Sequence, residues 1–189
     1  MADDMGSGKT LQMAALLAVR PRDTLIVTPP SVIAHWKDTL IPVMRARPWI
    51  LVRQTLCDAP SESSPAATKT AITSYQSLAA HGVRPCHRAG CIFKRRWDRV
   101  VLDEGHYVRN SNTAAYKAVC RLRNDRYATA AHKWVLSGTP INNGRNDLIS
   151  LGDWMGLPLL DPAVANAHIL RRTMQDIVDD DRARDLDGE

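Results

Sequence analysis

The stretch that decides the fold stands at the beginning of the chain, where residues 3–10 read Asp3-Asp4-Met5-Gly6-Ser7-Gly8-Lys9-Thr10. Glycines in such a loop allow backbone amides to turn inward around phosphate oxygens. A helix that begins directly afterwards adds the positive end of its dipole. In a loop of this kind Lys9 contacts the β- and γ-phosphates of ATP, and the Thr10 hydroxyl coordinates Mg²⁺. Asp3 stands where the usual pattern has Gly, so the motif needs support from elsewhere in the chain.

The composition is that of a soluble globular protein. The chain has 189 residues, of which 44% are hydrophobic and 24% charged, enough for one domain with a substantial core. It contains no apolar run that could serve as a signal peptide and none long enough to span a membrane. We therefore expect an intracellular protein without a membrane partner.

The four cysteines are expected to be reduced thiols, because no secretory signal accompanies them. Cys86 and Cys91 stand on either side of His87, and Cys57 offers a further ligand, so a zinc site is one interpretation. However, no second ligand pair stands at a typical zinc spacing. A basic loop over residues 81–96 is therefore the favoured interpretation.

Charge is unevenly distributed along the chain. Residues 173–189 hold seven acidic and two basic residues, whereas residues 1–172 hold 13 acidic and 23 basic ones, a net charge of +10. A basic body suits a polyanionic partner such as nucleic acid, although basic surfaces also arise for solubility alone.

Short apolar strands alternate with amphipathic helices. Five strands are predicted, over residues 24–28, 49–52, 70–73, 99–103 and 133–137. Helices are predicted over residues 10–19, 31–44, 113–121 and 145–154, with Ser31 as the N-cap of the second. Strands that are apolar throughout and separated by helices indicate an α/β fold, with a mainly parallel sheet covered on both faces.

Two acidic residues follow the fourth predicted strand. In Val100-Val-Leu-Asp103-Glu104-Gly105-His106 they stand at the carboxyl end of the strand, where ligands bind in open α/β sheets. Asp103 could hold Mg²⁺, and Glu104 could orient and deprotonate an attacking water. An ordinary strand that ends in acids at a turn is the alternative, and the preceding phosphate loop favours the site.

A third motif, Leu136-Ser137-Gly138-Thr139-Pro140, follows the last predicted strand. Hydroxyl groups at Ser137 and Thr139 could hydrogen-bond to His106 and so link a hydrolysis site to another surface. A Gly-Thr-Pro turn is common in loops, so the motif has weight only through its place in the order.

Taken together and in this order, the motifs resemble the first lobe of a Snf-family (Swi/Snf-type) ATPase, the helicase-like motors of chromatin remodellers. Further matches are Leu25-Ile-Val-Thr-Pro-Pro-Ser-Val32 with Trp36, Trp97-Asp-Arg-Val-Val-Leu-Asp-Glu-Gly-His106, and Ile169-Leu-Arg-Arg-Thr173 with Asp176-Ile177. The resemblance implies a RecA-like (P-loop NTPase) three-layer lobe that binds ATP and Mg²⁺ and acts on double-stranded DNA.

The resemblance also implies roles for individual residues. The ATP-binding residues would be Asp4, Met5, Gly6, Ser7, Gly8, Lys9 and Thr10. Thr10 and Asp103 would hold Mg²⁺, while Glu104 and Lys9 would be catalytic. The group that couples hydrolysis to DNA would be His106, Ser137, Gly138 and Thr139. Contacts to the backbone of duplex DNA, which fix position without reading sequence, would come from Thr28, Pro29, Ser31 and Ser74.

Some positions depart from the family pattern. Ser7 replaces a common Leu, Gly105 is a tolerated variant of Ala, and Met174 stands where Lys is common. The family also has a strand before the phosphate loop and a second RecA-like lobe. We therefore expect a fragment of a two-lobed motor with little activity alone, which a second lobe could complete in trans. Residues 1–160 would form the partial lobe, and residues 161–189 a lobe-closing segment and an acidic tail.

Two other functions compete with this interpretation. One is a non-catalytic nucleotide- or DNA-binding module that acts through a partner. The other is an unrelated phosphate-loop enzyme such as a small-molecule kinase, which would not explain Asp103-Glu104 together with Ser137-Gly-Thr-Pro140. The expected location is the nucleus for a eukaryotic protein or one from a virus in a nuclear setting, and otherwise the cytoplasm.

Overall fold

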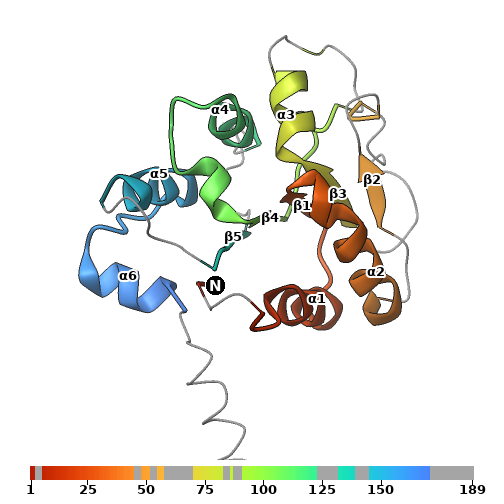
Figure 1. The fold of residues 1–189 in the computed structure, drawn as a ribbon, viewed down its shortest axis with the longest axis horizontal. Coiled ribbons are helices and arrows are strands. Elements are labelled where there is room, and N and C mark those ends of the chain that lie inside the picture. Colours follow the sequence, from red (N-terminus) through yellow and green to blue (C-terminus); the bar gives the residue numbers. More distant parts are fainter. Residues whose placement is uncertain are drawn as a thin grey trace, which may run out of the picture.

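Five parallel strands form the centre of the molecule, and helices cover both faces of the sheet (Figure 1). The computed structural model describes residues 1–2, 6–44, 48–51, 55–57, 70–82, 86, 91–122, 132–138 and 145–170. The sheet order is β2-β3-β1-β4-β5. The strands are β1 (Thr24–Thr28), β2 (Trp49–Leu51), β3 (Thr70–Ser74), β4 (Arg99–Asp103) and β5 (His132–Leu136). All five predicted strands are confirmed, with small shifts at their ends.

The helices and turns connect these strands. The helices are α1 (Lys9–Val19), α2 (Ile33–Met44), α3 (Tyr75–Gly82), α4 (Ala114–Arg121), α5 (Arg145–Met155) and α6 (Pro162–His168). Two short 3₁₀ turns, η1 (Pro30–Val32) and η2 (Gly105–Val108), precede α2 and follow β4. The four predicted helices correspond to α1, α2, α4 and α5, whereas α3 and α6 were not predicted.

The alternation of side chains along each strand creates two separate cores. On one face, Ile26 and its neighbours pack against α1 and α2, with Trp36 and Leu40 fully buried. On the other face, Leu25 and Val27 pack against α3, α4, α5 and the loops around them. The strands are apolar on both sides because both sides are covered, which is why their sequences lack an apolar–polar alternation.

Three sequence predictions need correction. Ser31 is not the N-cap of a helix, because it lies inside η1 and α2 begins at Ile33. The predicted basic loop over residues 81–96 is partly wrong, since His81 belongs to α3 and Cys91, Ile92 and Phe93 are buried in the core. The sequence also predicted no helix after the third strand, whereas α3 follows β3 directly, and the hydroxyl of Ser74 accepts the backbone N–H of Ser77 at 3.1 Å as an N-cap does.

Residues 1–2 run beside β5 at the free edge of the sheet. The Met1 nitrogen donates to the carbonyl of Val135 at 2.8 Å, and the N–H of Ser137 donates to the carbonyl of Met1 at 3.1 Å. This alternation of bonds is the pattern of a parallel pair. The chain therefore approaches the phosphate loop in the direction of the strands. Among the described helices, none has the length and apolarity needed to cross a membrane.

Gly105 allows η2 to approach β5 closely. A Cβ atom at this position would overlap Cγ1 of Val135, far inside van der Waals contact. The resemblance treats Gly105 as a tolerated variant of Ala, and the structure supplies the reason for Gly in this chain. Val135 occupies the space that the methyl group of Ala would take.

Gly105→Ala should lower the free energy of unfolding by about 1–3 kcal/mol, because Val135 is β-branched and cannot easily turn away. Val135→Ala removes the obstructing methyl groups, so Gly105→Ala should cost little in that background. Chemical denaturation of the two single variants and the double variant measures the coupling. An equal cost of Gly105→Ala in both backgrounds would contradict this packing explanation.

Candidate functional site

Polar side chains gather at the carboxyl edge of the sheet, where β1, β3 and β4 end side by side. In the parallel register Thr28 pairs with Ser74, and Val27 pairs with Leu102, so that Asp103 follows beside Thr28. Ligands of open α/β sheets bind at this edge. The structure thus brings together residues that are far apart in the sequence at the place where a ligand is expected.

The carboxylate of Asp103 is held by three donors. Its Oδ2 accepts hydrogen bonds from Thr28 Oγ1 at 2.9 Å and from Trp36 Nε1 at 2.7 Å. Its Oδ1 accepts the backbone N–H of Glu104 at 3.0 Å. Asp103 is only 7% exposed, so these donors replace the water that a buried carboxylate loses. Because each carboxylate oxygen can accept two bonds, Oδ1 retains capacity for a cation, which fits the predicted Mg²⁺ ligand.

The DNA contact assigned to Thr28 from the sequence stays a prediction, and in this structure its hydroxyl has another role. Thr28 has no exposed surface, and its hydroxyl supports Asp103 rather than reaching a DNA backbone. Pro29 is also buried, and Ser74 caps α3 with only 4% of its surface exposed. Of the four predicted DNA contacts, only Ser31 is exposed. All four residues lie at or just after the carboxyl ends of β1 and β3, and three of them are buried there.

Glu104 follows in a backbone conformation that L-residues rarely adopt. Its φ is 51° and its ψ 59°, and among the described residues other than Gly it alone has a positive φ. Such a conformation costs of order 1–3 kcal/mol and is common at functional sites. The sharp turn places Oε2 of Glu104 3.2 Å from Nδ1 of His106. Both side chains are partly exposed, so the Glu104 carboxylate remains accessible to water.

Tyr75, which follows the predicted DNA contact Ser74, fixes the backbone at the same point. Its hydroxyl donates to the carbonyl of Asp103 at 2.7 Å, and its ring stacks on Tyr107 with centroids 4.9 Å apart. Burial raises the pKa of Tyr75 well above its ordinary value, and the charges of Asp103 and Glu104 raise it further. The phenol therefore stays protonated and keeps its role as a donor.

The phosphate loop has the backbone geometry that an anion site needs. Gly6 and Gly8 have φ values of 84° and 75°, and both are exposed. Gly8 is the N-cap of α1 and has no side chain to cap the helix, so the first N–H groups of α1 suit phosphate oxygens. Lys9 Nζ lies 3.4 Å from Ser7 Oγ, and Gln12 Nε2 donates to the carbonyl of Ser7 at 2.9 Å. Asp4 and Met5 lie outside the described residues.

The predicted coupling group is described only in part. Ser137 is buried directly after β5, Gly138 is partly buried, and His106 pairs with Glu104. Thr139 lies outside the described residues. The coupling role of these four residues stays a prediction.

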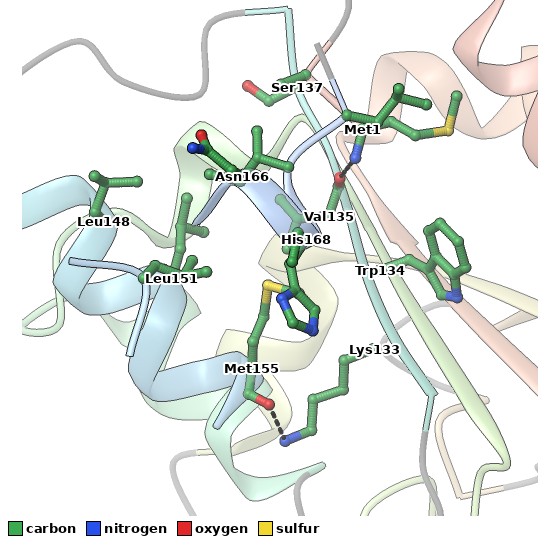
Figure 2. A pocket seen from close by; sticks show the side chains of 15 residues that line it. Met1, Lys133, Trp134, Val135, Ser137, Leu148, Leu151, Met155, Asn166 and His168 are labelled. Carbon is green, nitrogen blue, oxygen red and sulfur yellow. Dashed lines mark hydrogen bonds between the residues drawn. The ribbon is translucent and has the colours of Figure 1, made fainter. Parts of the chain in front are cut away.

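A pocket of about 490 Å³ lies away from these residues, between β5, α5 and α6. Figure 2 shows its mainly apolar lining, which includes Leu148, Leu151 and Met155. Lys133, a cation in the lining, donates to the carbonyls of Trp154 and Met155 at 2.9 and 3.4 Å. Neither the phosphate loop nor Asp103 and Glu104 contribute to this pocket, so it is not the candidate nucleotide site.

Comparison with known proteins matches most of the chain to one family model. Residues 1–176 match the model of the SNF2-related domain. A probable global transactivator of Orgyia pseudotsugata multicapsid polyhedrosis virus is 36% identical over 160 residues, which are 80% of this chain and 29% of that protein. DNA repair protein RAD5 of Yarrowia lipolytica is 31% identical over 175 residues, 82% of this chain and 16% of that protein. The chain thus spans less than a third of these relatives.

A solved structure has the same fold. The Sulfolobus solfataricus SWI2/SNF2 ATPase core in complex with dsDNA superposes with a TM-score of 0.66 at 23% sequence identity. The match covers 94% of this chain and 40% of that one. It confirms the predicted α/β fold of a RecA-like lobe.

Proposed function

The chain belongs to the SNF2-related domain family, and from this premise we propose that it is the ATP-binding lobe of a DNA-dependent ATPase that translocates on double-stranded DNA. The observation that carries the proposal is the buried Asp103 carboxylate, fixed by Thr28, Trp36 and the Glu104 N–H beside an accessible Glu104. Such an arrangement orients two adjacent acids for different tasks, one for a cation and one for a proton.

The residues of the site divide the work of phosphoryl transfer. The backbone of Gly6 and Gly8 and the ammonium of Lys9 would bind the phosphates of ATP. Thr10 and Asp103 would hold Mg²⁺, which when bound neutralises charge that develops on the phosphate oxygens. Glu104 would accept a proton from the attacking water, and the neighbouring His106 would keep its carboxylate in position.

Completion of the site would require a second lobe. Phosphoryl transfer in phosphate-loop enzymes gains roughly 10³–10⁵ in rate from an arginine placed on the far side of the γ-phosphate. The match to the SWI2/SNF2 ATPase core covers 40% of that chain. We propose that a second helicase lobe supplies this arginine, in trans where it is a separate chain.

The proposed DNA contacts are electrostatic. Residues 1–172 have a net charge of +10, which favours the phosphate backbone of a duplex over its bases. Among the predicted contacts, Ser31 is exposed enough to touch a DNA backbone, and this residue lies in η1, just after β1. Thr28, Pro29 and Ser74 would support this surface from beneath.

Lys9→Ala should weaken binding of Mg²⁺-ATP by about 10- to 100-fold, because charge-assisted hydrogen bonds are each worth about 1.5–3 kcal/mol. Isothermal calorimetry on residues 1–189 measures the change. Lys37→Ala serves as the control, since Lys37 is an exposed lysine of α2 whose nearest acidic partner is Asp38 at 3.9 Å. Equal affinities of the wild type and Lys9→Ala would refute the phosphate-loop assignment.

Binding to duplex DNA should weaken steeply as salt rises, with a log–log slope near −0.9 for each phosphate contact. Fluorescence anisotropy with a labelled duplex measures the slope, and a second duplex of scrambled sequence tests whether bases are read. Affinity that stays constant from low to moderate salt, or that differs strongly between the two duplexes, would rule out a backbone contact of this kind.

Residues 1–189 alone should hydrolyse ATP near the background rate, since the arginine of a second lobe is absent from the reaction. Addition or fusion of an intact second lobe should make hydrolysis dependent on duplex DNA. Measurement of phosphate release should then show that Glu104→Gln abolishes this DNA-dependent hydrolysis. The exposed control Asp38→Asn should retain it.

Rapid DNA-stimulated hydrolysis by residues 1–189 alone would show that the second lobe is not required. Nucleotide and DNA binding without hydrolysis, even with a second lobe present, would instead favour the non-catalytic module.

A further inference from the structure

Four side chains that bind transition metals meet at the end of α3 away from the nucleotide site. They are Cys57, His81, Cys86 and Cys91, and their ligand atoms all lie within 4.8 Å of one another. His81 Nε2 lies 3.5 Å from Cys57 Sγ and 3.3 Å from Cys91 Sγ, while Cys57 Sγ lies 3.2 Å from Cys86 Sγ. The imidazole nitrogen thus joins a group of three sulfurs.

These distances match the size of a single tetrahedral zinc site. With Zn–S bonds of ~2.3 Å and Zn–N bonds of ~2.0 Å, neighbouring ligand atoms of a tetrahedron lie about 3.5–3.8 Å apart. The observed contacts of 3.2–3.5 Å and the upper limit of 4.8 Å lie on either side of these values. Small side-chain rotations would therefore place all four ligand atoms around one ion.

Backbone hydrogen bonds hold the segments that carry Cys57 and Cys91. The N–H of Ile92 donates to the carbonyl of Leu56 at 2.8 Å, which ties the segment of Cys57 to that of Cys91. The carbonyl of Cys91 accepts the N–H groups of the next turn, from Lys94 at 2.8 Å and Arg95 at 3.2 Å. Leu56, Cys91 and Ile92 are almost completely buried. The ligands therefore come from parts of the chain that are folded against the core.

The histidine is fixed independently of the sulfurs. The His81 ring stacks on the Phe93 ring, with centroids 5.8 Å apart and planes 8° apart. The guanidinium of Arg121 also lies over the Phe93 ring, 4.4 Å from its centroid. Stacking fixes the direction in which Nε2 points. A His whose Nε2 is held beside two thiols, with a third thiol next to them, has the arrangement of a ligand.

A core of packed thiols is the simplest alternative, because cysteine is a small apolar side chain that is often buried. It explains Cys91, which is 1% exposed, but it gives no reason for a partly exposed His81 to direct its nitrogen at two sulfurs. Sequence reasoning set zinc aside because no second ligand pair stood at a typical spacing. The fold adds His81 as the fourth ligand beside the three cysteines, from helix α3, which was not predicted.

We propose that the chain binds one structural Zn²⁺ ion through Cys57, His81, Cys86 and Cys91. Three thiolates and an imidazole in a tetrahedral arrangement are typical of zinc. Four protein ligands leave no open position for a substrate or water, so the ion stabilises the fold and takes no part in catalysis. The ion joins the segment after β2, which carries Cys57, to α3, which carries His81, and to the segment before β4, which carries Cys86 and Cys91.

The direct test is the zinc content of residues 1–189, produced without an affinity tag in zinc-supplemented medium. Elemental analysis after dialysis should find one zinc per chain. Cys91→Ser and His81→Asn should lower this content to near zero. Cys120→Ser and His35→Asn should leave it unchanged, because both residues lie outside the cluster. Wild-type protein without zinc, or controls that lose it equally, would overturn the proposal.

Since a ligand variant that fails to fold would also lose zinc, thiol reactivity of the wild type provides a second measurement. Alkylation followed by peptide mass analysis should find Cys57, Cys86 and Cys91 protected, and a strong chelator should make all three reactive. The reactivity of Cys120 should change far less. Equal reactivity with and without chelator, or a Cys57–Cys86 disulfide in protein that contains no zinc, would contradict a metal site.

Discussion

The candidate site depends on one constraint, which is the burial of an ionised carboxylate at the end of β4. Asp103 is tolerated there because its oxygens accept three bonds, from Thr28, Trp36 and the backbone of Glu104. All three partners donate, so Asn would not be an equivalent residue. Whichever way an Asn amide turned, its NH₂ group would face the indole N–H of Trp36 or the N–H of Glu104. The geometry therefore requires an acid at this position.

Much of the fold follows from local sequence signals. The strands were predicted because runs such as Thr24–Thr28 and Arg99–Asp103 are apolar throughout, as strands buried on both faces must be. The helix α4 was predicted with Thr113 at its start, and Thr113 Oγ1 accepts the N–H of Tyr116 as a cap. In contrast, α3 has only eight residues and begins inside a strand-like run, so periodicity did not indicate it.

Sequence reasoning indicated the candidate site where chemistry and position coincide in the sequence, and it gave no indication of contacts that depend on tertiary partners. Asp103 and Glu104 stand at a strand end that any α/β fold would expose to ligands. Nothing in the sequence indicates that Thr28 and Trp36, from the neighbouring strand and the helix after it, meet at the same oxygen of Asp103. A buried Trp usually needs a partner for its N–H, which is the one signal that could have suggested the contact. The positive φ of Glu104 has no signal at all, since Gly would be the expected residue.

The proposed zinc site and the candidate nucleotide site both contact α3. Helices this short are not stable in isolation, so α3 depends on tertiary contacts, which include packing of the buried Leu78 in the core and contacts at both ends. At its beginning Tyr75 donates to the Asp103 carbonyl and stacks on Tyr107, and near its end His81 stacks on Phe93 within the cysteine cluster. With a rise of ~1.5 Å per residue, about 9 Å of helix separates Tyr75 from His81. A rigid helix of this length transmits a displacement of one end to the other. A metal ion bound by His81 would therefore hold the same helix that carries Tyr75, whose hydroxyl donates to the carbonyl of Asp103.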